Sequence, residues 1–302
     1  MSARDGTMDG KVALVTGGTG GIGKATAEGL ANLGARVVLV GRDRSKGEIA
    51  TAEIKTTTGN GAVELMIADL SLQEEIHRLA REFEANYDRL DVLVNNAGVM
   101  YARRFETEEG IEGTLAVIHL APVLMTNLLL LKLQRSAPSR IVNVSSWAHR
   151  RAKLDLDDLQ SRERYSPSAA YSRAKLCNVL WTYELARRLE GRGVTVNLAD
   201  PGGASTEMTR SEAMPLLFRT INRLGRRFMT TEKAARSSIY LASSPEVEAV
   251  SGGYFEPPNK RVKSSKASYD KTAQERVWEM SAELTKPNRS LQVHEGQKWD
   301  DD

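Results

Sequence analysis

Tyr171 and Lys175 have the residue types and spacing best suited to catalysis. They are four residues apart in Tyr171-Ser172-Arg173-Ala174-Lys175, so on a helix a phenol and an ammonium group share one face. Tyrosine has a reference pKa of about 10 and is a poor base at neutral pH, but a nearby positive charge favours its phenolate. Such a pair can donate a proton to a carbonyl oxygen or remove one from an alcohol. The alternative is a surface tyrosine and lysine on an amphipathic helix.

A glycine-rich run near the start of the chain has the spacing of a phosphate-binding turn. Residues 16–23 (TGGTGGIG) follow a β-branched stretch and open a helical pattern. A pyrophosphate reaches backbone N–H groups and the positive end of a helix only where no Cβ intervenes. A tight loop alone explains a glycine cluster equally well, whereas this strand–turn–helix context predicts a dinucleotide site. The expected contacts are Gly17, Thr19, Gly21, Ile22 and Gly23.

The end of the second predicted strand bears on which dinucleotide binds. An NAD site usually places an acidic residue there, which accepts a hydrogen bond from the ribose 2′-hydroxyl. Here the strand ends in Gly41-Arg42-Asp43. The Arg42 guanidinium matches a 2′-phosphate, which favours NADP over NAD, although a solvated loop arginine is the alternative and Asp43 keeps the question open. Asp69 and Leu70 are also expected to contact the cofactor, with Asp69 at the adenine edge or, alternatively, capping a helix.

Short β-branched runs alternate with helical periods along most of the chain, which predicts a parallel sheet with crossover helices. We expect a single α/β domain with a Rossmann-type, doubly wound parallel sheet of about seven strands over residues 9–256. Residues 1–8 are expected to be flexible, 257–286 to form an extension with a helix, and 287–302 to be disordered. Strands are expected at residues 11–16, 36–40, 61–67, 90–94, 140–144, 194–198 and 253–255, and helices at 21–33, 71–87, 108–133, 169–190, 231–243 and 268–284.

Composition argues against several other classes of protein. Lys and Arg number 42 against 39 Asp and Glu, so no strong field indicates nucleic acid as a partner. The single cysteine, Cys177, excludes an intramolecular disulfide and a multi-cysteine metal site, and no metal is expected. The N-terminus has no signal-peptide core, and the longest aliphatic run, at 128–131, is far shorter than the ~20 residues of a membrane span. We therefore expect a cytoplasmic protein without a membrane span.

Five motifs, in this order, resemble the short-chain dehydrogenase/reductase family over residues 8–255. They are residues 16–23, Asn95-Asn96-Ala97-Gly98, Val144-Ser145-Ser146, Tyr171-x-x-x-Lys175 and Pro201-Gly202. Within the family the chain is most similar to a soluble, bacterial-type, retinol-dehydrogenase-like branch. The resemblance implies that Ser146 hydrogen-bonds the reacting oxygen and that Lys175 also contacts the nicotinamide ribose. It further implies cofactor contacts from Asn96, Ala97, Gly98, Tyr171, Pro201, Gly202 and Thr206.

Two positions depart from the pattern of that branch. Its long helix usually has Val-Asn-His-Leu, whose asparagine holds a water that continues a proton relay, whereas this chain has Ile118 at the asparagine position. Asp200 stands where asparagine or histidine commonly precedes Pro-Gly, and it either alters the electrostatics beside the nicotinamide, faces solvent or caps a turn. Three outcomes remain open: carbonyl reduction with protons supplied by bulk water, an atypical reaction of specialised metabolism, or nucleotide binding without turnover.

Residues 204–230 place apolar side chains at helical spacing after the sixth strand, which predicts a lid over an apolar substrate. Ser146, Trp147, Ile118 and Asp200 are the expected substrate contacts. We therefore expect an NADP(H)-dependent oxidoreductase of the ketoreductase type acting on a hydrophobic carbonyl or alcohol. A nucleotide-sensing regulator is the alternative from a different class. The family resemblance also implies a homodimer or homotetramer formed by the long helices.

Overall fold

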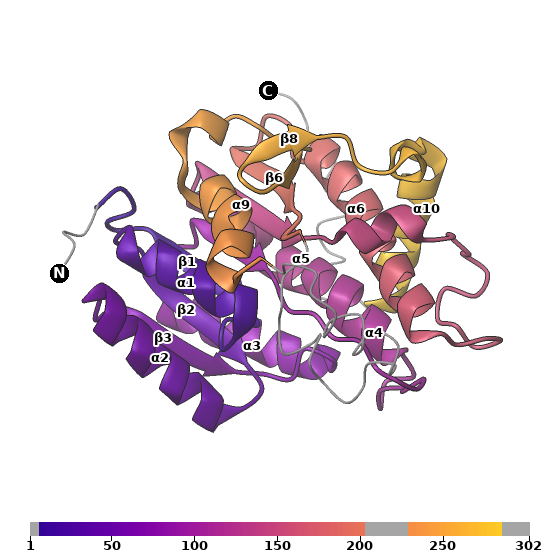
Figure 1. Cartoon of the computed structure of the whole chain (residues 1–302), viewed down its shortest axis with the longest axis horizontal. Coiled ribbons are helices and arrows are strands. Elements are labelled where there is room, and N and C mark those ends of the chain that lie inside the picture. The colour runs from indigo at the N-terminus through magenta and orange to yellow at the C-terminus, as the bar shows by residue number, and fades with distance from the viewer. Residues whose placement is uncertain (1–5, 203–228, 286–302) are drawn as a thin grey trace.

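The computed structural model describes residues 6–202 and 229–285. The predicted tail at 287–302, Thr206, residues 1–5 and nearly all of the predicted lid lie outside this part of the chain. Figure 1 shows one sheet with helices packed around it. Its strand order is β3-β2-β1-β4-β5-β6-β7-β8, and the order reverses direction between β1 and β4. The predicted single α/β domain with a doubly wound sheet is confirmed.

The seven predicted strands are all present, each within two residues of its expected bounds. They are β1 (Val12–Thr16), β2 (Arg36–Gly41), β3 (Val63–Ile67), β4 (Val92–Asn95), β5 (Ser139–Val144), β6 (Val194–Ala199) and β7 (Tyr254–Glu256). All of their pairings are parallel. An eighth strand, β8 (Lys260–Val262), pairs antiparallel with β7, so the expected count of about seven was one too low.

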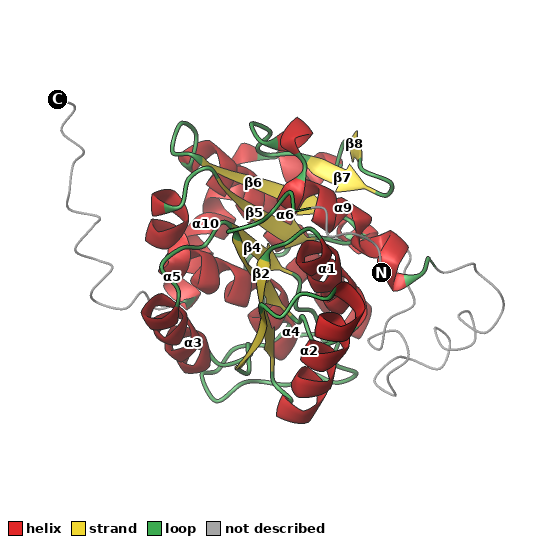
Figure 2. Cartoon of the chain, turned by 90° about the vertical axis from the view of Figure 1, so that its left-hand side faces the viewer, coloured by secondary structure: helices red, strands yellow, loops and turns green. Residues whose placement is uncertain are grey.

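Helices cover both faces of the sheet, as Figure 2 shows. One face carries α1 (Gly21–Asn32), α2 (Arg44–Thr58) and α9 (Thr231–Ser243), and the other carries α3 (Gln73–Asn86), α5 (Ala121–Arg135) and α6 (Pro167–Arg188). Each face buries its own apolar cluster against the strands. Short helical turns η2 (Trp147–Arg151), η3 (Pro245–Val247) and η4 (Lys266–Tyr269) lie between the longer elements.

The predicted helix at 108–133 is interrupted where it passes the centre of the molecule. It consists of α4 (Gly113–Leu115), a single π-helical turn η1 (Ala116–Leu120) and α5. Pro122 explains the interruption, because it has no N–H to donate to the carbonyl four residues earlier, which is that of Ile118. The segment Gly113–Arg135 is long and apolar enough to cross a membrane, but most of it is buried inside this fold, where it serves as a core helix.

The last described helix, α10 (Lys271–Leu284), packs against α6. Trp278 of α10 stacks on Trp181 of α6 with ring centres 5.8 Å apart, and the Arg188 guanidinium lies 4.4 Å from the centre of the Trp278 ring. α10 therefore covers part of α6, one of the two helices expected to pair between subunits. The homodimer or homotetramer stays a prediction.

Candidate active site

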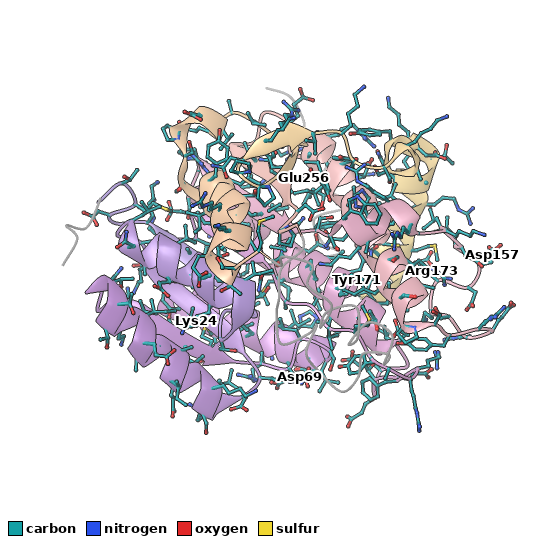
Figure 3. All side chains as sticks on the ribbon, in the orientation of Figure 1. Lys24, Asp69, Asp157, Tyr171, Arg173 and Glu256 are labelled. Atoms are coloured by element: carbon teal, nitrogen blue, oxygen red, sulfur yellow. The ribbon has the colours of Figure 1, made fainter. Side chains whose placement is uncertain are left out.

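The residues singled out from sequence come together at the carboxyl ends of the parallel strands. The glycine turn follows β1, Asn96 follows β4, Ser146 follows β5, and Pro201 and Gly202 follow β6. α6 presents Tyr171 to the same edge. Figure 3 labels Tyr171 on α6 and Asp69 near the other half of the sheet. Ligands of open α/β sheets bind at this edge, where the strand order reverses.

The glycine turn is packed so tightly that it has no room for side chains at Gly17 and Gly23. Gly17 has a φ of +63°, and a Cβ at Gly23 would lie 2.1 Å from the Gly17 carbonyl oxygen and 2.3 Å from Asn96 Nδ2. Asn96 holds the turn by donating to the carbonyl of Thr16 at 2.9 Å, while the Thr16 hydroxyl accepts the Asn96 N–H at 2.9 Å. The backbone of the glycine turn and the N-terminus of α1 thus have no side chain in front of them at Gly17 and Gly23. A pyrophosphate can approach them, so the residues present fit a dinucleotide.

Arg42 and Asp43 have different surroundings. The Asp43 carboxylate accepts the Lys46 N–H at 3.0 Å and caps the N-terminus of α2, so its oxygen is already engaged. Arg42 is exposed at the carboxyl end of β2. Its guanidinium lies beside the hydroxyl of Tyr101, whose pKa burial raises and Arg42 lowers. The residue available for the adenosine ribose is therefore basic.

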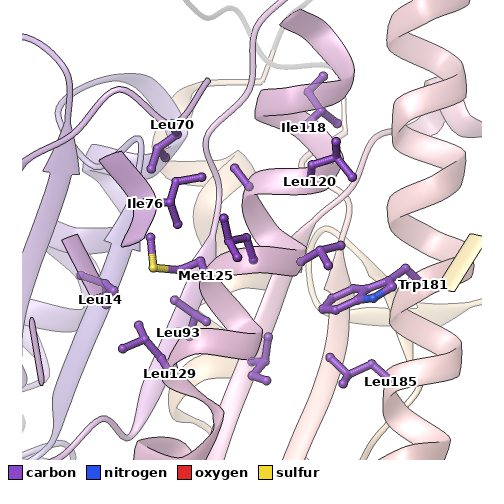
Figure 4. Packing of buried hydrophobic residues seen from close by; sticks show 14 of the residues in the cluster. Leu14, Leu70, Ile76, Leu93, Ile118, Leu120, Met125, Leu129, Trp181 and Leu185 are labelled. Carbon is purple, nitrogen blue, oxygen red and sulfur yellow. The ribbon is translucent and has the colours of Figure 1, made fainter. Parts of the chain in front are cut away.

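Asp69 and Leu70 follow β3. Asp69 does not cap a helix as the alternative interpretation held; its Oδ1 accepts both the N–H and the hydroxyl of Ser71, at 2.9 and 2.7 Å. α3 begins after Leu72, which makes no side-chain cap. Leu70 is only 8% exposed and packs at the edge of the apolar cluster in Figure 4.

Tyr171 and Lys175 are buried, and the partly exposed Ser146 lies beside Tyr171. The Ser146 side chain hydrogen-bonds the Tyr171 hydroxyl and also accepts the Ala148 N–H at 3.2 Å. Lys175 is 4% exposed, donates to the Val144 carbonyl at 2.7 Å, and places its Nζ 5.9 Å from the centre of the Tyr171 ring. The serine after β5 and the tyrosine of α6 thus meet at the Tyr171 hydroxyl, where a substrate oxygen can bind.

Burial dominates the protonation of this group. It raises the pKa of Tyr171 to about 12, against a lowering by the Ser146 hydrogen bond and a further raising by the charge of Asp200. Burial lowers the pKa of Lys175 to about 8, and Asp200 opposes that change. Burial therefore outweighs the effects of Ser146 and Asp200 on the pKa of Tyr171. A protonated Tyr171 at neutral pH is the form that can donate a proton.

Ile118 is fully inside the core, as Figure 4 shows, with 1% of its surface exposed. Its side chain packs in the apolar cluster, while its carbonyl accepts the Asn178 side-chain N–H at 3.3 Å. His119 points away from the site and hydrogen-bonds Ser281 of α10 at 2.7 Å; burial lowers its pKa to about 3, so it is neutral. The main-chain carbonyl at position 118, and not the side chain, is the polar group available here.

Asp200 does not face solvent, which was one of the interpretations left open. It is 1% exposed; its Oδ1 accepts the Gly202 N–H at 2.9 Å and its Oδ2 accepts the hydroxyl of Tyr254. The bond to Gly202 is a turn cap, as the other interpretation held. Sequence reasoning missed Tyr254, because no local pattern marks a strand tyrosine whose partner lies on the neighbouring strand.

Trp147 and His149 sit on η2, just after Ser146, and differ in exposure. Trp147 is 48% exposed and carries the Arg151 guanidinium 4.5 Å from its ring centre. His149 is buried; its Nδ1 donates to the Ser146 carbonyl at 2.7 Å and its Nε2 accepts the Ser265 N–H at 3.0 Å. His149 therefore fixes the loop that carries Ser146.

One cavity among residues 6–202 and 229–285 lies away from these residues. It measures about 650 Å³ and lies at the far end of α6, where Tyr183, Arg187 and Lys271 line it.

Within the described ranges, no group of three or more His, Cys, Asp or Glu side chains is placed to hold a metal ion. Cys177 is buried.

Comparisons with known proteins identify the family of this chain. The family model for short chain dehydrogenase matches residues 11–215. Human Retinol dehydrogenase 12 is 43% identical over 278 residues, covering 92% of this chain and 87% of that protein. Among solved structures, an uncharacterised protein from Mycobacterium paratuberculosis has a TM-score of 0.75 at 31% identity, covering 92% of this chain and 94% of that one.

The RhlG/NADP complex of Pseudomonas aeruginosa has a TM-score of 0.68 at 27% identity, and the alignment covers 84% of this chain and 97% of that one. The family match spans most of the chain and includes both the glycine turn and Tyr171. The chain therefore belongs to the short-chain dehydrogenase family, in its retinol-dehydrogenase-like branch, and is an oxidoreductase.

Proposed function

We propose that the chain transfers hydride between NADP(H) and a hydrophobic carbonyl or alcohol, with Tyr171 as the acid and base. The observation that carries this proposal is the contact of the partly exposed Ser146 with the buried Tyr171 beside Lys175, at the edge of the sheet where the glycine turn opens. The bound nicotinamide supplies or accepts the hydride. The side chains of this chain bind the substrate oxygen and transfer the proton.

Tyr171 and Ser146 would hold the substrate oxygen between their hydroxyl groups. The Ser146 hydroxyl, fixed by the Ala148 N–H, orients that oxygen, and Tyr171 donates its proton to it as negative charge develops. The pKa of Tyr171, raised to about 12 by burial, keeps this proton in place at neutral pH. Lys175, charged below its pKa of about 8, then stabilises the phenolate that forms. The site is thus better suited to carbonyl reduction than to alcohol oxidation at neutral pH.

Arg42 supports NADP as the preferred cofactor. It is exposed at the end of β2, where an NAD site has an acidic side chain, and the neighbouring Asp43 is engaged as the cap of α2. A guanidinium binds a 2′-phosphate through two hydrogen bonds. The RhlG structure, which was solved with NADP, gives independent support.

A hydrophobic substrate is supported by the relatives and by the site. The similar Retinol dehydrogenase 12 carries an apolar alcohol in its name. Beside the catalytic group, the exposed Trp147 offers apolar surface. A retinoid-sized aldehyde is therefore the first substrate to test.

The test pairs cofactor binding with turnover. NADPH and NADH are titrated into the purified protein by nicotinamide fluorescence, and all-trans-retinal reduction is followed with each cofactor. We expect NADPH to bind at least tenfold more tightly, which is about 1.4 kcal/mol. Tyr171→Phe should keep NADPH binding and lose reduction. Failure of both cofactors to bind contradicts the proposal.

A further inference from the structure

The middle of α6 is buried on every side. Each residue from Ala174 to Ala186 is buried, which is about three and a half turns at 3.6 residues per turn. A helix that is buried all round needs a cover on the side that faces away from its sheet. The strand β6 and the turns η1 and η2 pack against α6, and η4 and α10 pack against it as well. Figure 1 shows α10 beside α6 at the edge of the molecule, so α10 supplies the outward cover.

The helix α10 has one buried face and one exposed face. Gln274, Val277 and Ser281 are buried at positions i, i+3 and i+7, whereas residues 275, 276, 279, 282 and 283 are exposed. Four more side chains of α10 are partly buried and pack against the same apolar cluster as α6: Ala273, Trp278, Met280 and Leu284. Most of the stability of such an amphipathic helix comes from the surface that its apolar face covers. The place of α10 therefore depends on α6.

Aromatic and arginine side chains make the contact between the two helices. Trp278 of α10 stacks on Trp181 of α6, with ring centres 5.8 Å and planes 11° apart. The Arg188 guanidinium of α6 lies 4.4 Å from the centre of the Trp278 ring, and Arg187 donates to the Gln274 side-chain oxygen at 2.5 Å. Tryptophan and arginine are the residues that carry most of the binding energy where two proteins meet. The contact of α6 with α10 thus has the composition of an interface core.

Polar contacts tie the second half of α10 to two other elements. The buried Ser281 hydroxyl hydrogen-bonds His119 of η1 at 2.7 Å. The Gln73 side chain, at the start of α3, donates to the Leu284 carbonyl at 2.8 Å. These contacts fix the position of α10 along α6 as well as its distance from it. α10 is therefore docked at both of its ends and on three elements.

The surface under α10 is apolar and forms one stripe of α6. Trp181, Leu185 and Arg188 stand at i, i+4 and i+7, and they are called the outer face of α6 below. Trp181 and Leu185 are each 1% exposed, and Figure 4 shows them side by side. Without α10 this face would present an indole and a leucine to water. An exposed apolar patch of this kind marks a protein–protein interaction site, and two identical patches can pair about a two-fold axis.

The attachment of α10 to its own chain gives it an advantage over a second copy. Residues 229–285 are described without a gap, so α10 is joined to the sheet through β7, β8 and η4. A tethered segment meets its site at an effective concentration of about 1 mM. A second copy at about 1 μM is roughly a thousandfold more dilute and must bind more tightly by that factor to displace α10.

We propose that the outer face of α6 is a self-association surface and that α10 occupies it in place of a second copy of this chain. The chain thereby covers the helix that carries Tyr171 and Lys175 by a contact within one molecule. Pairing of two chains through α6 requires that α10 leaves. The inference concerns assembly and holds whatever substrate and cofactor the site takes.

A charge on the buried face of α10 tests the proposal. Val277 is fully buried between α10 and the core, so a carboxylate in Val277→Asp should release α10. Ala282→Asp is the matched control, because it places the same charge on the exposed face of the same helix. Sedimentation velocity from about 1 to 200 μM should show that Val277→Asp self-associates with a dissociation constant at least about tenfold below that of Ala282→Asp and of the unchanged chain. A Val277→Asp chain that stays monomeric while its α10 amides exchange freely overturns the proposal.

Hydrogen exchange of the α10 amides gives a second readout, on the unchanged chain. Their protection should be the same at about 1 and 200 μM, because α10 stays docked at both concentrations. Association that removes this protection would show that a second copy displaces α10, and it would overturn the proposal. If Val277→Asp does not fold, the double variant Gln274→Ala with Trp278→Ala removes two contacts to α6 without adding a charge and carries the same expectation.

Discussion

Replacing Lys175 by methionine should abolish catalysis and stabilise the fold at neutral pH. The pKa of Lys175 is about 8 in the folded chain against 10.5 for an ordinary lysine, and burial is the cause. The difference is about 2.5 units, so below pH 8 the buried charge costs about 3 kcal/mol at 1.36 kcal/mol per unit. Methionine leaves the Val144 carbonyl without its donor, which costs about 1 kcal/mol. The net gain at pH 7 is about 2 kcal/mol.

The sign of the pH dependence makes this prediction specific. Between pH 8 and 10.5 the unfolded chain keeps the Lys175 proton and the folded chain does not, so the stability of the wild type rises with pH. The advantage of Lys175→Met should therefore be largest below pH 8 and shrink above it. Urea unfolding at pH 6.5, 8 and 9.5 measures this, with Lys55→Met on the exposed face of α2 as the control. A variant less stable than wild type at pH 7, or an advantage that does not change with pH, refutes the reasoning.

Three further predictions use matched pairs or a single buried site. Gly23→Ala should lower the free energy of unfolding by about 1–3 kcal/mol and weaken NADPH binding at least about tenfold, because its Cβ would lie 2.1 Å from the Gly17 oxygen. Gly20→Ala is the control and should do neither, because nothing lies within 4 Å of its Cβ. Equal effects of the two variants would contradict the role of the glycine turn in binding the cofactor. Trp278→Ala should cost about 2–3 kcal/mol through loss of its stack on α6, whereas Trp147→Ala, 48% exposed, should change stability by less than about 0.5 kcal/mol and raise KM for retinal. Ile118→Asn buries an amide in the apolar core and should cost about 3 kcal/mol without raising turnover; a faster enzyme would show that the side chain at this position limits the proton supply.

Most of the parallel strands were predictable because they are short apolar runs rich in valine and isoleucine, which is typical of strands buried on both faces. α2 and β8 were not predicted. Within α2 only Gly47, Ala50 and Ile54 are buried, so its apolar stripe is too thin to show a helical period. β8 is a three-residue edge strand of Lys260, Arg261 and Val262, and its pairing with β7 depends on the turn between them and not on its own composition.

The catalytic and cofactor motifs were predictable for a different reason: the ends of parallel strands meet at one edge, so motifs that follow strands must converge there. Sequence could not show what a residue meets across the sheet. Asp200 faces Tyr254 only because β6 and β7 are neighbours, and this register, with Leu198 beside Tyr254, follows from the whole sheet. The burial of the Asp200 carboxylate beside the Tyr254 hydroxyl therefore depends on the tertiary structure, and no local sequence pattern predicts it.

The Ile118 position shows how a side-chain pattern can mislead about a backbone function. Read as a side chain, isoleucine in place of asparagine removes a polar group from the proton path. Pro122 four residues later, however, has no N–H for the carbonyl of Ile118, and the helix passes through a π turn at that point. The carbonyl is thereby free to accept from Asn178, one turn beyond Lys175 on α6. The polar contact toward α6 at this position thus depends on the proline and the helix turn, and it persists whatever side chain residue 118 carries.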